Sequence, residues 1–318
     1  MADYVTIDGG TTNTRINLTV SDMIVDTVKL SVGARLGLDN KSEYKSSIKQ
    51  GIDELLSRNG IAAPEAIICS GMITSEGGLI ELPHIPAPAG IDELSRALVR
   101  VQIPEISDIP FVFIPGVKLS GEGLSESDMM RGEETELYGL CDKPLRDTLY
   151  LLPGSHTKLI RTDGKGRITL FFTSLTGEMI AALSEGTILS GSVNIRDTAL
   201  DEEYLRAGCE YAAKQGISSA LFKVRILDRA LGRSADEVYS FFLGVILSSD
   251  CNSILSLPES TVVIGGKSAL KNAFALLLRE SGKKIIAVDD EAVEKATATG
   301  ALKIYKKHLE VTGNGKAI

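Results

Sequence analysis

The chain has 318 residues, of which 43% are hydrophobic, and 42 acidic against 34 basic side chains give it a formal net charge of −8. This length favours two domains or one large one, and the ordinary apolar fraction indicates a packed globular protein. The acidic excess argues against a nucleic-acid backbone or an anionic membrane surface as the main partner, although a local cationic pocket could still take an anionic substrate.

The four cysteines are spaced too widely for the common metal and redox motifs. Cys69, Cys141, Cys209 and Cys251 include no C-x-x-C pair, so zinc, iron–sulfur and thioredoxin-type sites are not expected. The first residues lack the charged-then-apolar run of a signal peptide, and no uninterrupted run of about 18 apolar residues is present. We therefore expect a cytoplasmic protein without a membrane span.

Segments rich in β-branched residues are interleaved with segments of helical periodicity. Strands are predicted at 4–7, 15–20, 23–30, 66–69, 111–114, 149–152, 158–161, 168–172, 261–264 and 284–288. Helices are predicted at 44–56, ending at Gly60, and at 198–215, 234–254, 269–279 and 291–309. The second and third of these helices begin with the capping-box patterns Thr198-x-x-Asp201 and Ser234-x-x-Glu237. Interleaved strands and helices indicate an α/β fold.

An approximate internal repeat is the most informative feature of this organisation. Residues 4–30 have the order strand, Gly/Thr turn, strand, short turn, strand, and residues 149–172 repeat it with a Gly-Ser-His-Thr turn. A duplication predicts two related domains, at 1–115 and 116–290, whose small polar turns face one cleft. The helix at 291–309 is expected to return to the first domain. Coincidence between two hairpins is the alternative.

The first turn, Asp8–Arg15 (DGGTTNTR), directly follows a predicted strand. Its glycines would let the backbone approach a phosphate, while its Thr hydroxyls and amide groups would donate hydrogen bonds. Asp8 is placed to hold Mg²⁺ through water, because Mg²⁺ retains much of its hydration shell. An ordinary hairpin with polar turn residues is the alternative, and no Walker loop is present.

Two later turns could complete a nucleotide site. Gly154–Lys158 (GSHTK) offers a histidine and a lysine that could meet a phosphate, although His156 alone would more often be structural. Val262–Leu270 (VVIGGKSAL) reads as strand, Gly-Gly, helix N-terminus, which would let a ribose or flat ring pack on the backbone. A tight strand-to-helix turn explains the second segment equally well.

Two polar segments offer groups for a substrate. The pattern of Ser127–Glu136 (SDMMRGEETE) predicts the start of a helix. Its carboxylates either belong to a solvated first turn or include a general base. Its arginine could pair with a substrate carboxylate. The irregular segment 70–88 leaves a strand end, where α/β folds often carry ligands, and a Pro-rich surface crossover is the alternative.

Taken in order, Asp8–Arg15, Gly154–Lys158, Gly265–Leu270 and Ala298–Gly300 resemble the two phosphate motifs, the adenosine motif and the second connecting helix of the sugar kinase, Hsp70 and actin superfamily. More narrowly, the chain resembles the 2-keto-3-deoxygalactonokinase family over nearly its whole length. The strings that carry this likeness are Ser70–Ile73 (SGMI), Met130–Thr135 (MRGEET), Leu152–Lys158 (LPGSHTK) and Thr176–Glu178 (TGE). Gly9 departs from the pattern, because many members have Trp there.

The resemblance implies an α/β protein of two ribonuclease H-like (actin/hexokinase-type) domains with an ATP cleft between them. It further implies a galactonate-degradation kinase that uses ATP and Mg²⁺ to phosphorylate 2-dehydro-3-deoxy-D-galactonate at its 6-hydroxyl. The expected partners are this sugar acid and ATP, without nucleic acid or membrane, and a homodimer remains open.

The motifs and the resemblance together assign roles to residues. Asp8 is expected to hold the metal and to act in catalysis, with Glu133 favoured over Asp128 as the base. The residues expected to bind ATP and its phosphates are Gly9, Gly10, Thr11, Thr12, Asn13, Gly154, Ser155, His156, Thr157, Lys158, Gly265, Gly266 and Ser268. The residues expected to bind the sugar acid are Arg15, Ser70, Met72, Arg131 and Glu134, with Arg131 on the carboxylate.

Three other functions remain as alternatives. A kinase of the same superfamily could act on another sugar, an amino sugar or a different 2-keto acid, and no motif excludes this. An actin- or Hsp70-like ATPase would need polymer-contact or peptide-binding segments, for which 318 residues leave little room. A sugar-responsive regulator would be expected to carry a basic DNA-binding segment, which does not precede the first strand.

Overall fold

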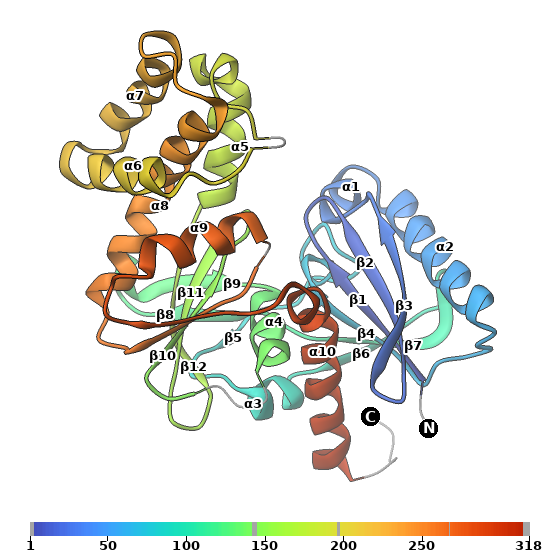
Figure 1. Cartoon of the computed structure of the whole chain (residues 1–318). Coiled ribbons are helices and arrows are strands. Elements are labelled where there is room, and N and C mark those ends of the chain that lie inside the picture. The colour runs from blue at the N-terminus through green and yellow to red at the C-terminus, as the bar shows by residue number, and fades with distance from the viewer. Residues whose placement is uncertain (1–2, 142–144, 196–197, 267, 314–318) are drawn as a thin grey trace. The chain divides into compact units, whose positions relative to one another are not determined.

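The computed structural model describes residues 3–141, 145–195, 198–266 and 268–313, and the chain packs as two units. Unit 1 consists of Met1–Arg146, Thr162–Leu170 and Glu291–Ile318, and unit 2 consists of Asp147–Arg161 and Phe171–Asp290. Figure 1 shows the elements of both units.

Unit 1 is built on a six-stranded sheet in the order β3-β2-β1-β4-β7-β6. Its strands are β1 (Asp3–Gly9), β2 (Thr14–Val20), β3 (Met23–Leu30), β4 (Ala66–Gly71), β6 (Val99–Ile103) and β7 (Ser107–Phe113). Neighbours β1, β2 and β3 are antiparallel, whereas β1, β4 and β7 are parallel. Helix α2 (Lys41–Asn59) buries Ile48, Ile52 and Leu55 in the core beside this sheet and ends at Gly60, whose φ of +66° suits glycine.

Shorter elements surround this sheet. They are α1 (Ala34–Asp39), η1 (Met72–Thr74), β5 (Ile85–Pro86), α3 (Ile91–Arg96), β8 (Val117–Ser120), η2 (Leu124–Glu126), β9 (Ser127–Met130) and α4 (Glu133–Leu140). Strands β5, β8 and β9 form a separate small sheet.

Helix α10 (Asp290–Thr312) completes unit 1. It packs against α4 so closely that two glycines leave no room for a side chain. A Cβ on Gly139 would lie 1.7 Å from the Ala296 carbonyl oxygen, and a Cβ on Gly300 would lie 1.9 Å from the Thr135 carbonyl oxygen. His308 Nδ1 lies 2.7 Å from the Ser95 carbonyl oxygen. Close packing of this kind fixes α4 on α10.

Unit 2 contains a five-stranded sheet in the order β12-β11-β10-β13-β14. Its strands are β10 (Thr148–Leu152), β11 (Thr157–Thr162), β12 (Ile168–Ser174), β13 (Thr261–Ile264) and β14 (Lys284–Ala287). Its helices are α5 (Thr176–Gly186), η3 (Ile188–Gly191), α6 (Glu202–Gln215), α7 (Ile217–Arg229), α8 (Ala235–Ser256) and α9 (Ser268–Leu278). Helices α5, α6 and α7 contact α8 (Figure 1).

The two sheets share the strand arrangement that the predicted repeat requires. In each, two hairpin-linked strands lie beside the first strand of the unit, and two later strands extend the sheet in parallel on its other side. Each predicted strand and helix is present. The capping box at Ser234 forms as expected: the Ser234 hydroxyl accepts from the Glu237 N–H, and the Glu237 carboxylate accepts from the Ser234 N–H.

Three expectations about local boundaries need correction. Helix α6 begins at Glu202, because Asp201 itself caps it by accepting from the Tyr204 N–H, while Thr198 bonds the Asn194 carbonyl instead. The stretch read as one helix start is split into strand β9 and helix α4. Unit 1 also extends past residue 115 to Arg146, since β8, β9 and α4 pack within it.

Helix α8 is the longest apolar segment of the described residues. By length and mean hydropathy it could cross a membrane, although polar residues interrupt its apolar run. However, 72% of the most apolar 18-residue stretch of this helix is buried inside the structure. Val238, Phe242 and Leu247 lie in the core of unit 2. A helix that is apolar all round is typical of a buried core position.

Candidate active site

The turn after β1 is held in place by the start of α1. The Gly10 N–H donates to the Asn13 carbonyl at 2.8 Å, and the carbonyls of Gly10 and Thr11 accept from the N–H groups of Ala34 and Arg35, each at 3.0 Å. Thr11, Thr12 and Asn13 remain exposed, with the Asn13 amide donating to the Thr12 hydroxyl at 3.0 Å. The turn therefore presents hydroxyl and amide groups to solvent on a fixed backbone.

Gly33, which the sequence analysis did not single out, makes this fixation possible. A Cβ on Gly33 would lie 2.5 Å from the Gly10 carbonyl oxygen and 2.6 Å from the Thr11 carbonyl carbon. Any larger residue would separate the start of α1 from the turn. The only sequence signal is a glycine immediately before a short helix.

Three glycines bring the end of β1 against two other segments. A Cβ on Gly71 would lie 2.5 Å from the Gly9 carbonyl oxygen, and one on Gly132 would lie 3.2 Å from the Gly71 Cα. Gly71 and Gly132 also have φ values of +80° and +113°, which L side chains rarely adopt. The segment preceding α4 is thus placed beside the end of β1, where Asp8 lies.

Asp8 belongs to a charged cluster made by β1, β2 and α4. Burial raises the pKa of Asp8, the Arg15 guanidinium opposes that rise, and the nearby Glu133 carboxylate adds to it. Glu136, one turn along α4 from Glu133, has its pKa raised to about 8 by burial and by the charges of Glu133 and Asp8. The structure therefore brings together three predicted residues and one, Glu136, that was not predicted.

This donor set fits a magnesium ion held mainly through water. Among the residues that the structure describes, no group of three or more His, Cys, Asp or Glu side chains is arranged to surround a metal. Mg²⁺ in phosphoryl-transfer sites commonly uses one or two carboxylates together with water and substrate phosphates. Mutually repelling carboxylates with raised pKa values are the surroundings that a divalent cation would stabilise.

Arg131 is bound within unit 1 by its own side chain. Nη1 donates to the Thr74 carbonyl at 2.7 Å and to the Thr74 hydroxyl at 2.5 Å, while Nη2 donates to the Leu82 carbonyl at 2.8 Å and lies 3.3 Å from His84 Nδ1. Both Nη atoms thus have hydrogen-bond partners, so a bidentate bond from them to a substrate carboxylate would require breaking these contacts. The geometry favours an anchoring role for Arg131 on the segment 74–84.

Glu134 and Asp128 also make local bonds. Glu134 is fully buried and accepts from the Gly132 N–H with its two oxygens at 2.9 and 2.8 Å. Burial raises its pKa to about 8, with the Glu133 charge as the second cause. Asp128 lies in β9, where its Oδ1 accepts from the Met129 N–H at 2.6 Å. Glu134 is therefore closed to a substrate, whereas Asp128 is partly exposed.

Ser70 and Met72 flank Gly71 at the end of β4. Ser70 pairs with Asp8 across the parallel β1–β4 ladder and is 1% exposed. Met72 begins η1, and its carbonyl accepts from the Ser75 N–H at 3.1 Å and from the Ser75 hydroxyl at 2.7 Å. The β1–β4 pairing places this strand end beside Asp8, but of the two residues only Met72 is partly exposed.

The corresponding turn of unit 2 is held by the start of α5. The Ser155 carbonyl accepts from the N–H groups of Gly177 at 3.1 Å and Glu178 at 3.2 Å, and a Cβ on Gly177 would lie 2.5 Å from the Gly154 carbonyl oxygen. His156 Nε2 lies 3.0 Å from Glu178 Oε1. The side chains of Ser155 and His156 are exposed, so this turn too presents polar groups on a fixed backbone.

The next two residues of this motif, Thr157 and Lys158, are buried and therefore unsuited to binding a phosphate. Lys158 is only 3% exposed, and its Nζ donates to the Thr173 hydroxyl at 2.5 Å and lies 5.9 Å from the centre of the Phe171 ring. Thr157 is buried, and its hydroxyl oxygen has no hydrogen-bond partner among the described residues.

The Gly-Gly turn after β13 lies against the first turn of unit 2. The Gly265 N–H donates to the Leu151 carbonyl at 2.9 Å. Gly266 has a φ of +73°, and a Cβ there would lie 2.5 Å from the Pro153 carbonyl oxygen. The structure therefore brings the predicted phosphate and nucleoside motifs of unit 2 together. Ser268 begins α9, and its side chain lies outside the described part of the chain.

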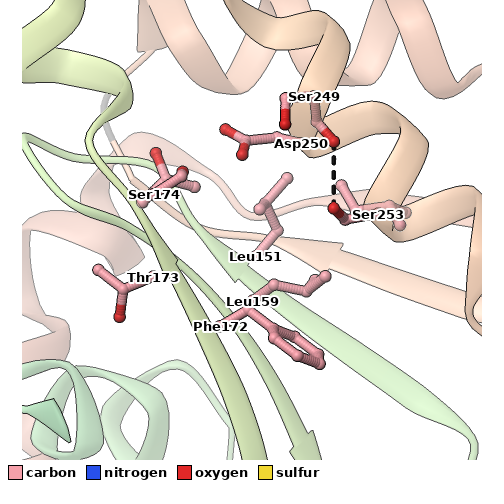
Figure 2. A pocket seen from close by; sticks show the side chains of 10 residues that line it. Leu151, Leu159, Phe172, Thr173, Ser174, Ser249, Asp250 and Ser253 are labelled. Carbon is pink, nitrogen blue, oxygen red and sulfur yellow. Dashed lines mark hydrogen bonds between the residues drawn. The ribbon is translucent and has the colours of Figure 1, made fainter. Parts of the chain in front are cut away.

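A pocket of about 150 Å³ lies between α8 and the sheet of unit 2. Figure 2 shows Asp250 of α8 and Ser174 of β12 near each other above Leu151 and Leu159 of the sheet. The pocket is also lined by the unpartnered Thr157 hydroxyl.

Comparison with known proteins decides the family. The sequence profile of the 2-keto-3-deoxy-galactonokinase family matches residues 8–304. The chain belongs to this family. A relative from Rhizobium meliloti (strain 1021), named a probable 2-dehydro-3-deoxygalactonokinase, is 26% identical over 314 residues, covering 95% of this chain and 97% of the relative. The family accounts for the resemblance seen in the RGEET and LPGSHTK strings.

Solved structures support the fold of this family member. A structure from Sinorhizobium meliloti that carries the 2-dehydro-3-deoxygalactonokinase name has a TM-score of 0.78 and 21% identity, covering 99% of both chains. The activator of 2-hydroxyisocaproyl-CoA dehydratase from Clostridium difficile, solved with bound ADPNP, has a TM-score of 0.54 and 14% identity, also covering 99% of both chains. The predicted fold class, with two ribonuclease H-like units of the actin and sugar-kinase type, is confirmed.

Proposed function

We propose that this kinase transfers the γ-phosphoryl group of ATP to the 6-hydroxyl of 2-dehydro-3-deoxy-D-galactonate, as a cytoplasmic step of galactonate degradation. The observation that carries the proposal is the cluster of Asp8, Arg15 and Glu133, fastened by three closely packed glycines in a chain of the 2-keto-3-deoxy-galactonokinase family. The name of the Rhizobium meliloti relative supports the same substrate.

In this proposal, unit 1 supplies the groups that act on the reacting atoms. Glu133 accepts the proton of the sugar hydroxyl as its oxygen bonds to the γ-phosphorus and the bond to the ADP oxygen breaks. Such proton transfer by a positioned carboxylate contributes typically about 10²–10⁴-fold to the rate. Mg²⁺, held by Asp8 through water, would offset the negative charge on the transferring group when bound. The fixed turn 10–13 donates hydrogen bonds to the same group.

The cation available to the sugar acid is Arg15 rather than Arg131. Its Nη1 donates to the Glu294 carbonyl at a long 3.4 Å, its Nη2 lies 3.9 Å from the Glu294 carboxylate, and its side chain is 29% exposed. A guanidinium whose Nη contacts are long can bind a carboxylate at a lower cost than one whose Nη atoms already make short hydrogen bonds. We therefore place Arg15 on the substrate carboxylate and Arg131 in support of the segment 74–84.

In unit 2, the turn 154–156 and the Gly265–Gly266 turn would hold the nucleotide. Exposed amide and hydroxyl groups on a fixed backbone suit phosphate oxygens, and the close approach of Gly266 to Pro153 leaves a backbone surface free of bulky side chains. The ADPNP-bound neighbour of the same fold supports the binding of a nucleotide by analogy.

A coupled ADP-release assay tests the proposal. Purified protein with Mg-ATP is given both 2-keto-3-deoxy epimers, plain hexoses and amino sugars, and the product position is read by ³¹P and ¹H NMR. A strong preference for the galactonate-derived acid, with phosphate on its 6-oxygen, is expected. A preference for another acceptor would refute the substrate, and acceptor-independent ATP hydrolysis would favour the ATPase alternative.

A further inference from the structure

A carboxylate outside the proposed catalytic groups is connected by hydrogen bonds to the phosphate-facing turn of unit 2. Asp250 lies in the apolar helix α8, where it is the last charged residue before the helix ends. Its Oδ2 accepts from the Thr176 hydroxyl at 2.6 Å, and Thr176 Oγ1 lies 2.7 Å from the Ser174 hydroxyl. Thr176 is 2% exposed, so this bond is shielded from competing water.

Thr176 is the first residue of α5, and the next two residues hold the turn. Gly177 and Glu178 donate their N–H groups to the Ser155 carbonyl, and the Glu178 carboxylate lies 3.0 Å from His156 Nε2. The contact is too tight for independent movement, because a Cβ on Gly177 would lie 2.7 Å from the Ser155 Cα. The position of the α5 N-terminus therefore sets the position of the turn.

We propose that Asp250 is a positioning residue for the turn 154–156, acting through the Thr176 hydroxyl and the first turn of α5. The inference rests on the proposed function, in which this turn binds ATP phosphate. Asp250 touches neither nucleotide nor sugar acid; it determines where the N–H groups of Gly177 and Glu178 hold the Ser155 backbone.

The surroundings of Asp250 fit this role. It borders the pocket on the sheet side of α8, together with Ser174 and the uncharged residues shown in Figure 2. Burial raises its pKa, and the hydrogen bonds from Thr176 and Ser174 work against that rise. A carboxylate kept in such a place needs those donors, because burying a charge without hydrogen bonds is costly. The bond from Thr176 is thus strong enough to constrain α5.

The test compares four single variants and one double variant of the full-length enzyme. Asp250→Ala and Thr176→Val each remove the bond, while Thr176→Ser keeps the hydroxyl. Ser253→Ala is the matched control, since Ser253 lines the same pocket on the same helix but its hydroxyl donates to the Ser249 carbonyl of its own helix. Each variant is assayed for kcat and for the KM values of ATP and sugar acid, well below its melting temperature.

Asp250→Ala and Thr176→Val are expected to lower kcat/KM for ATP about tenfold, the equivalent of one hydrogen bond to a charged group. The double variant should be no worse than Asp250→Ala, because that variant already removes the bond that Thr176→Val removes. Thr176→Ser and Ser253→Ala should stay within about twofold of the wild type, and the KM for the sugar acid should be unchanged in all variants.

Two results would overturn the proposal. One is a wild-type kcat/KM for ATP in both Asp250→Ala and Thr176→Val; the other is a loss seen only as a lower melting temperature, which a structural role would produce. Failure of the proposed function can be told apart from failure of this inference. If the proposed function is wrong, the wild-type enzyme itself shows no acceptor-dependent ADP release.

Discussion

Replacing Gly33 by alanine should displace the phosphate-facing turn of unit 1 without touching any catalytic group. The new Cβ would lie 2.5 Å from the Gly10 carbonyl oxygen, roughly 1 Å short of ordinary van der Waals contact. Both nearest groups are backbone, so no rotamer change relieves the overlap. The start of α1 and the turn must therefore separate, and the bonds from the Ala34 and Arg35 N–H groups to the turn are lost or lengthened.

Two backbone hydrogen bonds at about 0.5–1.5 kcal/mol each predict a loss of about 1–3 kcal/mol in the free energy of unfolding. The catalytic effect should be larger, because a displacement of about 1 Å at a reacting group can cost on the order of a hundredfold in rate. We expect kcat/KM for ATP to fall by roughly ten- to a hundredfold in the coupled assay, with unfolding followed in urea.

Gly186→Ala is the matched control, because a Cβ there has open space within 4 Å. The same chemical change should leave both activity and stability close to the wild type. Wild-type kcat/KM and stability in the Gly33 variant would show that α1 does not hold the turn, and the argument from close approach would fail.

Further predictions concern the charged residues of unit 1. Asp8→Asn should lower kcat by about a hundredfold or more while changing the KM for the sugar acid little; an intact kcat in the coupled assay would remove Asp8 from catalysis. Arg131→Ala should cost about 2–4 kcal/mol of unfolding free energy in urea, whereas Arg15→Ala should mainly raise the KM for the sugar acid, about tenfold; the reverse pattern would exchange their roles. The buried Glu134 keeps its proton up to a pH of about 8, whereas an unfolded glutamate releases it near 4.5. The free energy of unfolding should therefore fall as pH rises between these values, by up to roughly 1.4 kcal/mol per pH unit. Glu134→Gln should make that slope shallower, and an unchanged slope would contradict the raised pKa.

The sequence predicted the repeated hairpins and the elements around them because each strand has a clear local pattern. Asp8, Arg15 and Glu133 were singled out from a polar turn and a charged segment, and the structure brings them together through β1, β2 and α4. Helix ends were less predictable: Thr198 and Asp201 both suit an N-cap, and only the fold shows that Asp201 accepts the bond from Tyr204.

What the sequence left hidden depends on contacts between distant segments. Gly33 is an ordinary glycine until α1 is seen against the turn, and Glu136 is one acid among several until α4 is placed beside β1. The hydrogen-bond partners of Arg131 come from a loop about fifty positions away in the chain. Sequence spacing therefore could not predict them. Asp250 had one signal, an acid within the apolar part of α8 beyond its first turn, but its partner on α5 could not be predicted from the sequence.

The three-segment construction of unit 1 has a consequence for how the chain folds as it is synthesised. Helix α10, which fixes α4 through Gly139 and Gly300 and bonds Ser95 through His308, leaves the ribosome only after every strand of unit 2. Domains generally fold as units during synthesis, beginning with the one made first. Here the order should be reversed: unit 2 has its complete set of strands while unit 1 still lacks the helix that closes it. The N-terminal segment of unit 1 therefore stays incompletely packed until α10, which follows unit 2 in the sequence, has been synthesised.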